Sequence, residues 1–216
     1  RMTAAGDGLP SLNGPFGVRG SPDGANVYVA AREADTVIAF SRQANGTLKY
    51  LTLLSDVAGP SVALDAPTEL AISPDGRFLY VTSLNDDAVQ ILRRSTADGS
   101  IELQEAVAVG VDPYHILISK DAYGERLVVA LWNGDGIKAY ARDWQSGGLG
   151  PVTGQGAVTP DGPVFLVAPA DGRFVYAALY DGKGVLQMRS SRRAPLVQNL
   201  SPAAVPAGSS ASDLAG

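Results

Sequence analysis

Two ionisable side chains stand at the same spacing from a proline in separate parts of the chain. Glu69 lies two residues after Pro67, and His115, the only histidine, lies two residues after Pro113. A histidine can act as a general base or an electrostatic stabiliser, and a glutamate as its partner or as a second acid–base group. Arg19, which follows a third such proline, could anchor an anionic substrate. The alternative is that Glu69 and His115 are polar residues satisfied by water and backbone.

This spacing belongs to a repeat of about 50 residues. The turn glycines Gly24, Gly76, Gly124 and Gly172 are 52, 48 and 48 residues apart. Each repeat contains four short runs typical of strands, separated by turn-forming residues; in the second repeat they are TELAIS, RFLYVTS, AVQILRR and SIELQEAVAV. The pattern predicts an all-β fold, a β-propeller of four-stranded antiparallel blades, with about four blades present in a partial ring.

The blade boundaries follow from the repeat. We expect blades at residues 14–61, 62–110, 111–158 and 159–192. Residues 1–13 form an N-terminal segment that could supply the last strand of a preceding blade. Residues 193–216 read either as a linker or as the start of a further module, because APLVQNLSPAAVPAGSSASDLAG is similar to the opening of TIG-like immunoglobulin-fold modules in bacterial surface proteins.

Composition excludes several classes of function. With 45% apolar and 18% charged residues the chain is typical of a folded protein, and its net charge of −5 argues against a nucleic-acid surface. The absence of cysteine excludes disulfides, thiolate nucleophiles and cysteine-ligated metals. No apolar run approaches the roughly 20 residues that a membrane-spanning helix needs.

The segment SPDGRFLYVTSLNDDAVQIL, residues 73–92, resembles the YVTN-type repeat of the lactonase-like seven-bladed propellers, a family that includes 6-phosphogluconolactonases. The resemblance covers roughly residues 10–190. It implies a ring that closes with seven blades, so four blades would leave two open edges, each able to pair with another chain. We therefore expect a fragment of a larger ring or self-association through the open blade edges.

The resemblance also implies where the site lies. In such propellers the start of the first strand of each blade and the loop between its second and third strands share one face. DPYHILIS keeps the proline–histidine spacing that lactonase-like blades often show, with Tyr114 in place of an arginine. Leu131 and Trp132 stand where an Asn-Glu pair is common in such blades. Charged groups that the resemblance leads one to expect on this face, which we call the mouth of the channel, are therefore missing. Opening a lactone needs an activated water and a stabilised oxyanion, which His115, Glu69 and Arg19 could supply.

The second-to-third loops read READ, LNDD, WNGD and YDGK. Their side chains are candidates for binding a glycan, a small lactone or a protein; the binding candidates are Arg32, Asn85, Trp132, Asn133 and Tyr180, together with Arg19. The aromatic residues could stack on a sugar, or they could cover the hydrophobic edge between blades. Asp35, Asp87 and Asp135 could hold Ca²⁺ through their oxygens, or they could cap turns. No other cofactor is indicated.

Two functions from different classes fit these residues. The first is a non-enzymatic binding or scaffold module of a secreted or surface bacterial protein, which would be extracellular, cell-surface or periplasmic. The alternative is a hydrolase that opens a sugar-type lactone at the channel mouth, cytoplasmic if it is a true phosphogluconolactonase. A purely architectural role as a spacer in a repeat array is a third reading.

Overall fold

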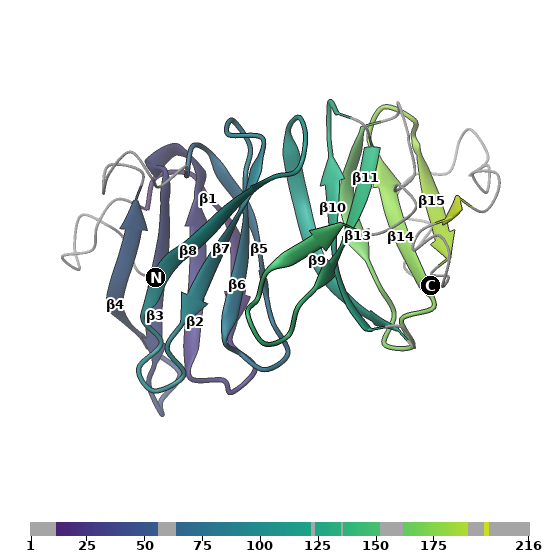
Figure 1. Cartoon of the computed structure of the whole chain (residues 1–216). Helices are drawn as coiled ribbons and strands as arrows, with labels where there is room; N and C mark the ends of the chain where they lie inside the picture. The colour runs from purple at the N-terminus through teal and green to yellow at the C-terminus, as the bar shows by residue number, and fades with distance from the viewer. Residues whose placement is uncertain are drawn as a thin grey trace.

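The computed structural model describes residues 12–55, 64–121, 124–134, 136–151, 162–189 and 197–198. Within these residues the chain forms four antiparallel sheets, and each sheet takes four strands in chain order (Figure 1). The first two sheets consist of β1 (Pro15–Gly20), β2 (Asn26–Ala31), β3 (Thr36–Arg42) and β4 (Leu48–Ser55), then β5 (Pro67–Ile72), β6 (Phe78–Ser83), β7 (Ala88–Arg94) and β8 (Ile101–Ala108). A short 3-10 helix, η1 (Arg32–Ala34), joins β2 to β3.

The third and fourth sheets repeat this arrangement. They consist of β9 (Pro113–Asp121), β10 (Gly124–Leu131), β11 (Gly136–Arg142) and β12 (Leu149–Pro151), then β13 (Pro163–Val167), β14 (Phe174–Leu179), β15 (Gly184–Arg189) and β16 (Val197–Gln198). β16 pairs with β15. Residues 197–198, which the sequence places in a linker or a further module, therefore add a fourth strand to the last sheet.

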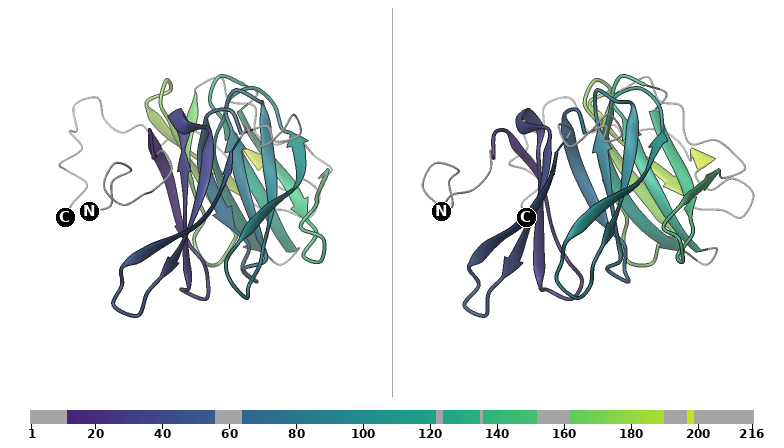
Figure 2. Two further views of the ribbon diagram at one scale, coloured as in Figure 1. Left: turned by 90° about the vertical axis from the view of Figure 1, so that its left-hand side faces the viewer. Right: turned by 60° about the vertical axis from the view of Figure 1, so that its left-hand side comes forward.

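The sheets stand side by side like the blades of a propeller (Figures 1 and 2). Their first strands, β1, β5, β9 and β13, contact one another in chain order. The first and fourth sheets lie at opposite ends of the array, at the left and right of Figure 1. The predicted all-β fold, a partial propeller of about four blades, is confirmed. Among the described residues no helix is long and apolar enough to cross a membrane.

The Pro-Asp-Gly turns between the first and second strands hold their shape by local hydrogen bonds. In the second blade the N–H of Gly76 donates to the carbonyl of Ser73 at 2.8 Å, and the Ser73 hydroxyl donates to the Asp75 carboxylate at 2.5 Å. Gly76 has a φ of +70°, which favours glycine. Ser21, Asp23 and Gly24 make the same bonds in the first blade. The repeated sequence thus produces a repeated turn.

Apolar side chains fill the space between neighbouring blades. Three clusters of buried residues join the first blade to the second, the second to the third, and the third to the fourth. Leu70, Ile116 and Leu166, each three residues after a proline, are buried in these clusters, as the alternation of strand residues predicts. Val18, at the same position of the first blade, is 55% exposed, because no described blade precedes it.

Candidate functional site

The four inner strands begin with the same irregularity. Just after each opening proline, the pairing register with the second strand shifts, for example between Pro15 and Gly17 in β1 and between Pro163 and Phe165 in β13. β5 and β9 shift at the corresponding place. Proline donates no ladder hydrogen bond, and a bulge bends the strand and redirects the side chains beside it. The residues two positions after the prolines therefore lie at a bend.

This bend brings three of the predicted residues together. Nε2 of His115 lies 3.7 Å from Oε2 of Glu69, and Nη2 of Arg19 lies 3.3 Å from the same oxygen. The other oxygen of Glu69, Oε1, accepts the N–H of Leu70 at 2.9 Å. The backbone thus fixes the Glu69 carboxylate, which contacts a residue from the blade on either side.

Burial sets the protonation of the pair. Glu69 and His115 are each 7% exposed. Burial, reinforced by the positive charge of Arg19, lowers the pKa of His115 to about 4, so that the imidazole is neutral at pH 7. Burial also raises the pKa of Glu69, against the opposing effects of the Leu70 N–H and Arg19. At 3.7 Å the neutral imidazole and the carboxyl group are in contact without a hydrogen bond or an ion pair.

His115 retains hydrogen-bonding capacity. Its Nδ1 atom is buried and has no hydrogen-bond partner in the described part of the chain. On the fourth blade, Phe165 occupies the position equivalent to His115, and the two ring centroids lie 5.2 Å apart in an edge-to-face arrangement. Phe165 is itself exposed. An exposed aromatic side chain thus packs against a neutral imidazole whose Nδ1 is unsatisfied.

Gly17 occupies the equivalent position on the first blade, and its lack of a side chain makes room for Glu69. A Cβ at Gly17 would lie 2.6 Å from the carbonyl oxygen of Thr68 and 2.9 Å from Oε1 of Glu69. Any larger residue would push β5 or the carboxylate away. Glycine at this position is therefore needed for the Glu69 carboxylate to lie where it does.

A row of aromatic rings crosses the loop face from the first blade to the fourth. Phe16 and Tyr114 pack edge to face with centroids 5.4 Å apart, Tyr114 and Trp132 at 5.3 Å, and Trp132 and Tyr180 at 6.3 Å. Phe16 and Tyr180, the ends of the row, are exposed. Phe16 and Tyr114 immediately precede Gly17 and His115, so the row borders the polar cluster.

Two of the loop aspartates form hydrogen bonds with the backbone of the next blade. Asp35 accepts the backbone N–H of Ala66 at 2.9 Å, and Asp87 accepts that of Asp112 at 3.1 Å. Both aspartates have positive φ, and both N–H donors immediately precede the opening proline of the following blade. Asp135 lies outside the described residues. Among those described, no group of three acidic or histidine side chains could hold a metal ion.

The other polar candidates are also engaged within the loops. Asn85 donates to Asp65 at 2.8 Å, and Asn133 donates to Asp112 at 2.8 Å. Arg32 lies in η1, and its backbone N–H donates to the carbonyl of Gly14 at 2.8 Å. In the first three blades these contacts tie the second-to-third loop to the segment before the inner strand. They stabilise the rim of the mouth.

A cavity of about 250 Å³ runs along the inner strands below the mouth. Its lining is mainly apolar, with Arg19 as the charged member; the lining residues are Arg19, Gly20, Pro22, Ala71, Ile72, Ile116, Leu117 and Ile118. Arg19 therefore faces both Glu69 and this cavity.

The sequence does not identify every residue of the site. It predicts His115, Glu69, Arg19, Trp132 and Tyr180, but it does not indicate the aromatic residues that pack against them. Phe16 and Tyr114 stand one residue after equivalent prolines, and this repeated aromatic position is a signal that could have identified them. No local pattern indicates that Phe165 packs against His115.

Comparison with known proteins places these features in a family context. A family model described as lactonase, 7-bladed β-propeller, matches residues 52–168. Similar solved structures include a candidate 6-phosphogluconolactonase from Bacteroides uniformis, with 20% identity and a TM-score of 0.72 over 86% of this chain and 53% of that one. The periplasmic gluconolactonase of Pseudomonas aeruginosa has 21% identity and a TM-score of 0.65, over 87% of this chain and 53% of that one.

A protein from Lactobacillus plantarum has 18% identity and a TM-score of 0.72, over 87% of this chain and 57% of that one. No curated protein matches. The chain spans about half the length of these solved structures, and at such identities the likeness shows a shared fold.

Proposed function

The chain belongs to the lactonase family of seven-bladed β-propellers, and from this premise we propose that its loop face hydrolyses a sugar-type lactone, with His115 as the general base. The observation that carries the proposal is the cluster of His115, Glu69 and Arg19 at the bulged starts of three inner strands. The unprotonated imidazole of His115 can accept a proton from water, and the adjacent Glu69 carboxylate can stabilise the imidazolium that forms and raise its pKa during the reaction.

The reaction needs one water molecule and no other reactant. Neutral His115 takes a proton as the water oxygen bonds to the lactone carbonyl carbon. The ring C–O bond then breaks, and the ring oxygen leaves as a hydroxyl with the proton that His115 returns. Arg19, whose side chain is partly exposed, donates N–H groups to the carbonyl oxygen as that oxygen gains negative charge. Glu69 orients Arg19 and stabilises the transient imidazolium.

Charge favours an unphosphorylated substrate. The guanidinium of Arg19 is already 3.3 Å from the Glu69 carboxylate, which offsets its positive charge. A phosphate would find little net attraction in this cluster. The aromatic row beside it offers apolar ring surface of the kind that packs against the C–H face of a sugar. D-gluconolactone fits both features.

Hydrolysis of D-gluconolactone, followed above its spontaneous rate, tests the proposal. We expect His115→Gln to lower kcat by about 10²-fold or more, the usual contribution of a general base. Glu69→Gln should also lower kcat, whereas Glu102→Gln, on strand β8 of the same blade, should leave it unchanged. The 6-phosphate ester should be a poorer substrate. A wild-type rate equal to the spontaneous rate would exclude the hydrolase.

The aromatic row favours a second candidate, sugar binding without turnover. Calorimetry with an unreactive methyl pyranoside measures this directly. Trp132→Ala should weaken binding about tenfold or more, because buried aromatic contacts dominate such surfaces. Trp144→Ala is the matched control: this exposed tryptophan packs near Arg77 at the turn between β11 and β12. Equal affinities of the two variants would remove the row from the binding site.

A further inference from the structure

The second blade carries two buried hydroxyl groups at positions where the other three blades have none. Thr68 follows the opening proline of β5, and Thr82 lies on β6, six residues after the turn glycine; both are fully buried. The residues equivalent to Thr82 are Ala30, Ala130 and Ala178. Those equivalent to Thr68 are Phe16, Tyr114 and Val164. Among the four blades, the two hydroxyls therefore occur only on the blade that contributes Glu69.

These hydroxyls change how β5 pairs with β6. On the other blades the residue two positions after the proline lies directly opposite the alanine of the second strand; these pairs are Gly17–Ala30, His115–Ala130 and Phe165–Ala178. On the second blade direct pairing resumes only at Leu70, opposite Val81. In between, the hydroxyl oxygen of Thr82 accepts the N–H of Glu69 at 2.9 Å and lies 3.3 Å from the Glu69 carbonyl oxygen. A side chain thus holds Glu69 where its equivalents pair with a strand.

The hydroxyls also connect Glu69 to the blade that carries His115. The side-chain oxygens of Thr82 and Thr68 lie 2.8 Å apart, and the Thr68 hydroxyl donates to the carbonyl of Pro113 at 3.3 Å. Pro113 opens β9, two residues before His115. A path of hydrogen bonds therefore runs from the Glu69 N–H through both threonines to the start of β9. Because all these residues are buried, the bonds form in a low-dielectric interior, where they are stronger than in water.

The position of the Glu69 carboxylate follows from this backbone. Oε1 of Glu69 accepts the N–H of the next residue, Leu70, at 2.9 Å. Oε2 lies 3.3 Å from Nη2 of the partly exposed Arg19 and 3.7 Å from Nε2 of His115. Glu69 and Arg19 are the charged groups that face His115 from β5 and β1, and Phe165 faces it from β13. A shift of the Glu69 backbone would therefore move the carboxylate relative to the imidazole.

We propose that Thr82 and Thr68 are positioning residues, whose hydroxyls hold the Glu69 carboxylate against the imidazole of His115. The consequence for catalysis rests on the hydrolysis proposed above, whereas the contact itself can be measured without turnover. Without the Thr82 hydroxyl, β5 can pair with β6 as the inner strands of the other blades do. The backbone of Glu69 would then move towards β6, and its carboxylate would leave His115.

Hydrolysis of D-gluconolactone tests the consequence for catalysis. Thr82→Val nearly keeps the shape of the side chain and removes the hydroxyl. We expect kcat to fall about tenfold or more with KM little changed, because a small misplacement beside the reacting atoms is enough for such a loss. Thr82→Ser, which restores the hydroxyl, should recover most of the rate. In a Glu69→Gln background Thr82→Val should lower kcat no further, because the hydroxyl acts through Glu69.

Proton NMR of His115, the only histidine, tests the contact without substrate. As Glu69 ionises, its charge shifts the ring resonance of His115 at 3.7 Å, and Glu69→Gln should remove this step of the pH titration. In Thr82→Val the step should shrink by about half or more, because the effect of a charge falls with distance. Thr68→Val, which cuts the path to Pro113 but leaves the bond to the Glu69 N–H, should shrink it as well.

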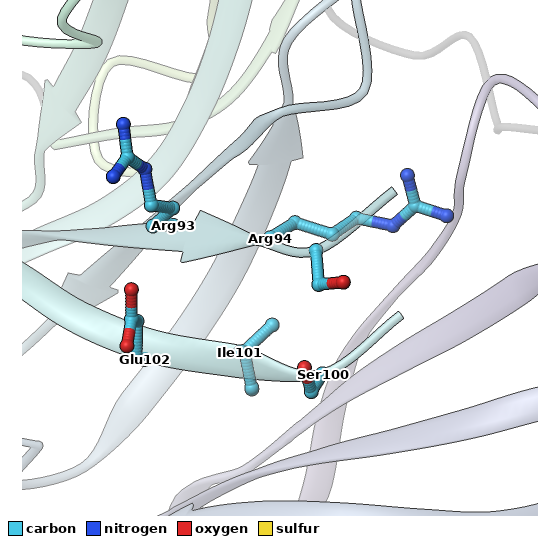
Figure 3. A pocket seen from close by; sticks show the side chains of 6 residues that line it. Arg93, Arg94, Ser100, Ile101 and Glu102 are labelled. Atoms are coloured by element: carbon cyan, nitrogen blue, oxygen red, sulfur yellow. The ribbon is translucent and has the colours of Figure 1, made fainter. Parts of the chain in front are cut away.

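Two controls match these variants. Thr36→Val removes a buried hydroxyl that has no hydrogen-bond partner in the described part of the chain, so it should change neither measurement. Glu102→Gln removes a carboxylate of the same blade, in the cavity that Arg93 and Arg94 line beside the turn between β7 and β8 (Figure 3). It should leave the titration of His115 unchanged. Circular dichroism checks that every variant is folded.

The two measurements separate the possible failures. A titration step that shrinks as expected supports the positioning role, even if the wild type hydrolyses lactone no faster than the spontaneous rate, which would exclude only the hydrolase. A step of wild-type size in folded Thr82→Val and Thr68→Val would overturn the inference, whatever the rates are. So would a wild-type titration that Glu69→Gln leaves unchanged, because Glu69 and His115 would then not be in contact.

Discussion

At the scale of residues, burial affects His115 and Glu69 more than any hydrogen bond between them does. His115 and Glu69 are nearly inaccessible, and their closest polar atoms do not reach hydrogen-bond distance. Burial raises the pKa of Glu69, against the opposing effects of the Leu70 N–H and Arg19, and it lowers the pKa of His115. This keeps the imidazole able to accept a proton at pH 7, which the proposed chemistry requires.

The low pKa of His115 predicts acid sensitivity. The unfolded chain binds a proton at a pKa near 6.5, whereas the folded chain does so at about 4. Between these values the unfolded state holds more protons, so stability falls as pH drops from about 6.5 to 4. From pH 7 to pH 5 the loss is about 2 kcal/mol. Urea unfolding at both pH values measures it.

His115→Gln isolates this contribution, because Glu69, whose raised pKa acts in the opposite direction in its own range, remains in both proteins. The variant should lose about 2 kcal/mol less than the wild type over the same interval. If the two proteins lose stability in parallel, His115 titrates normally in the folded state.

The positions of Glu69 and His115 could be predicted from the sequence, whereas the role of the loop aspartates could not. The shared distance from a proline places Glu69 and His115 at equivalent positions, and the repeat puts those positions on neighbouring blades. The sequence leaves the loop aspartates open between calcium binding and turn capping. Only the fold shows that Asp35 and Asp87 accept N–H groups of the next blade, because their partners are 31 and 25 residues away.

At the scale of elements, an arginine at the end of the third strand contacts a tyrosine and an aspartate of the preceding blade, and we call this contact the Tyr–Asp–Arg clasp. Arg94 makes it with Tyr28 and Asp23, and Arg142 makes it with Tyr80 and Asp75. The clasp predicts what the loss of one hydroxyl costs in stability. The Tyr80 hydroxyl accepts a hydrogen bond from Arg142 and donates one to the carbonyl of Gly147 at 2.7 Å. Tyr80→Phe leaves both buried partners unsatisfied. We expect the free energy of unfolding to fall by about 1–3 kcal/mol.

Tyr50→Phe provides the comparison, because Tyr50 lies partly exposed on the outer strand β4. Its change in unfolding free energy should stay within about 0.5 kcal/mol. Chemical denaturation measures the unfolding free energy of both variants. If Tyr80→Phe loses no more stability than Tyr50→Phe, water replaces the lost hydroxyl in the clasp.

The strands and turns are well predicted, and their irregularities are not. Alternating residues and Pro-Asp-Gly turns locate each strand to within a few residues, since both signals are local. The bulge after each proline depends on pairing with the second strand, so local sequence does not specify it. Yet this bulge places Glu69 and His115 at the mouth.

At the scale of the whole molecule, the repeat period predicts the propeller and the partial ring, and both are confirmed. The exposure of Val18 could not be predicted from its repeat position, because the equivalent residues are buried in each blade for which the structure describes a preceding blade. A repeat predicts what an average blade does, whereas the end blades depend on neighbours. The junction between the third and fourth blades shows the same limit: Val128 replaces the clasp tyrosine there, and its cluster is apolar.

The direction of the clasp makes the second blade an interchangeable module. It presents an arginine to the blade before it and a tyrosine with an aspartate to the blade after it. A tandem duplicate of this blade would therefore fit its own original on one side and the third blade on the other. The same duplicate placed between the third and fourth blades would meet valine where it needs tyrosine. Ring size in such a chain can thus be altered by gene duplication at one junction and not at another.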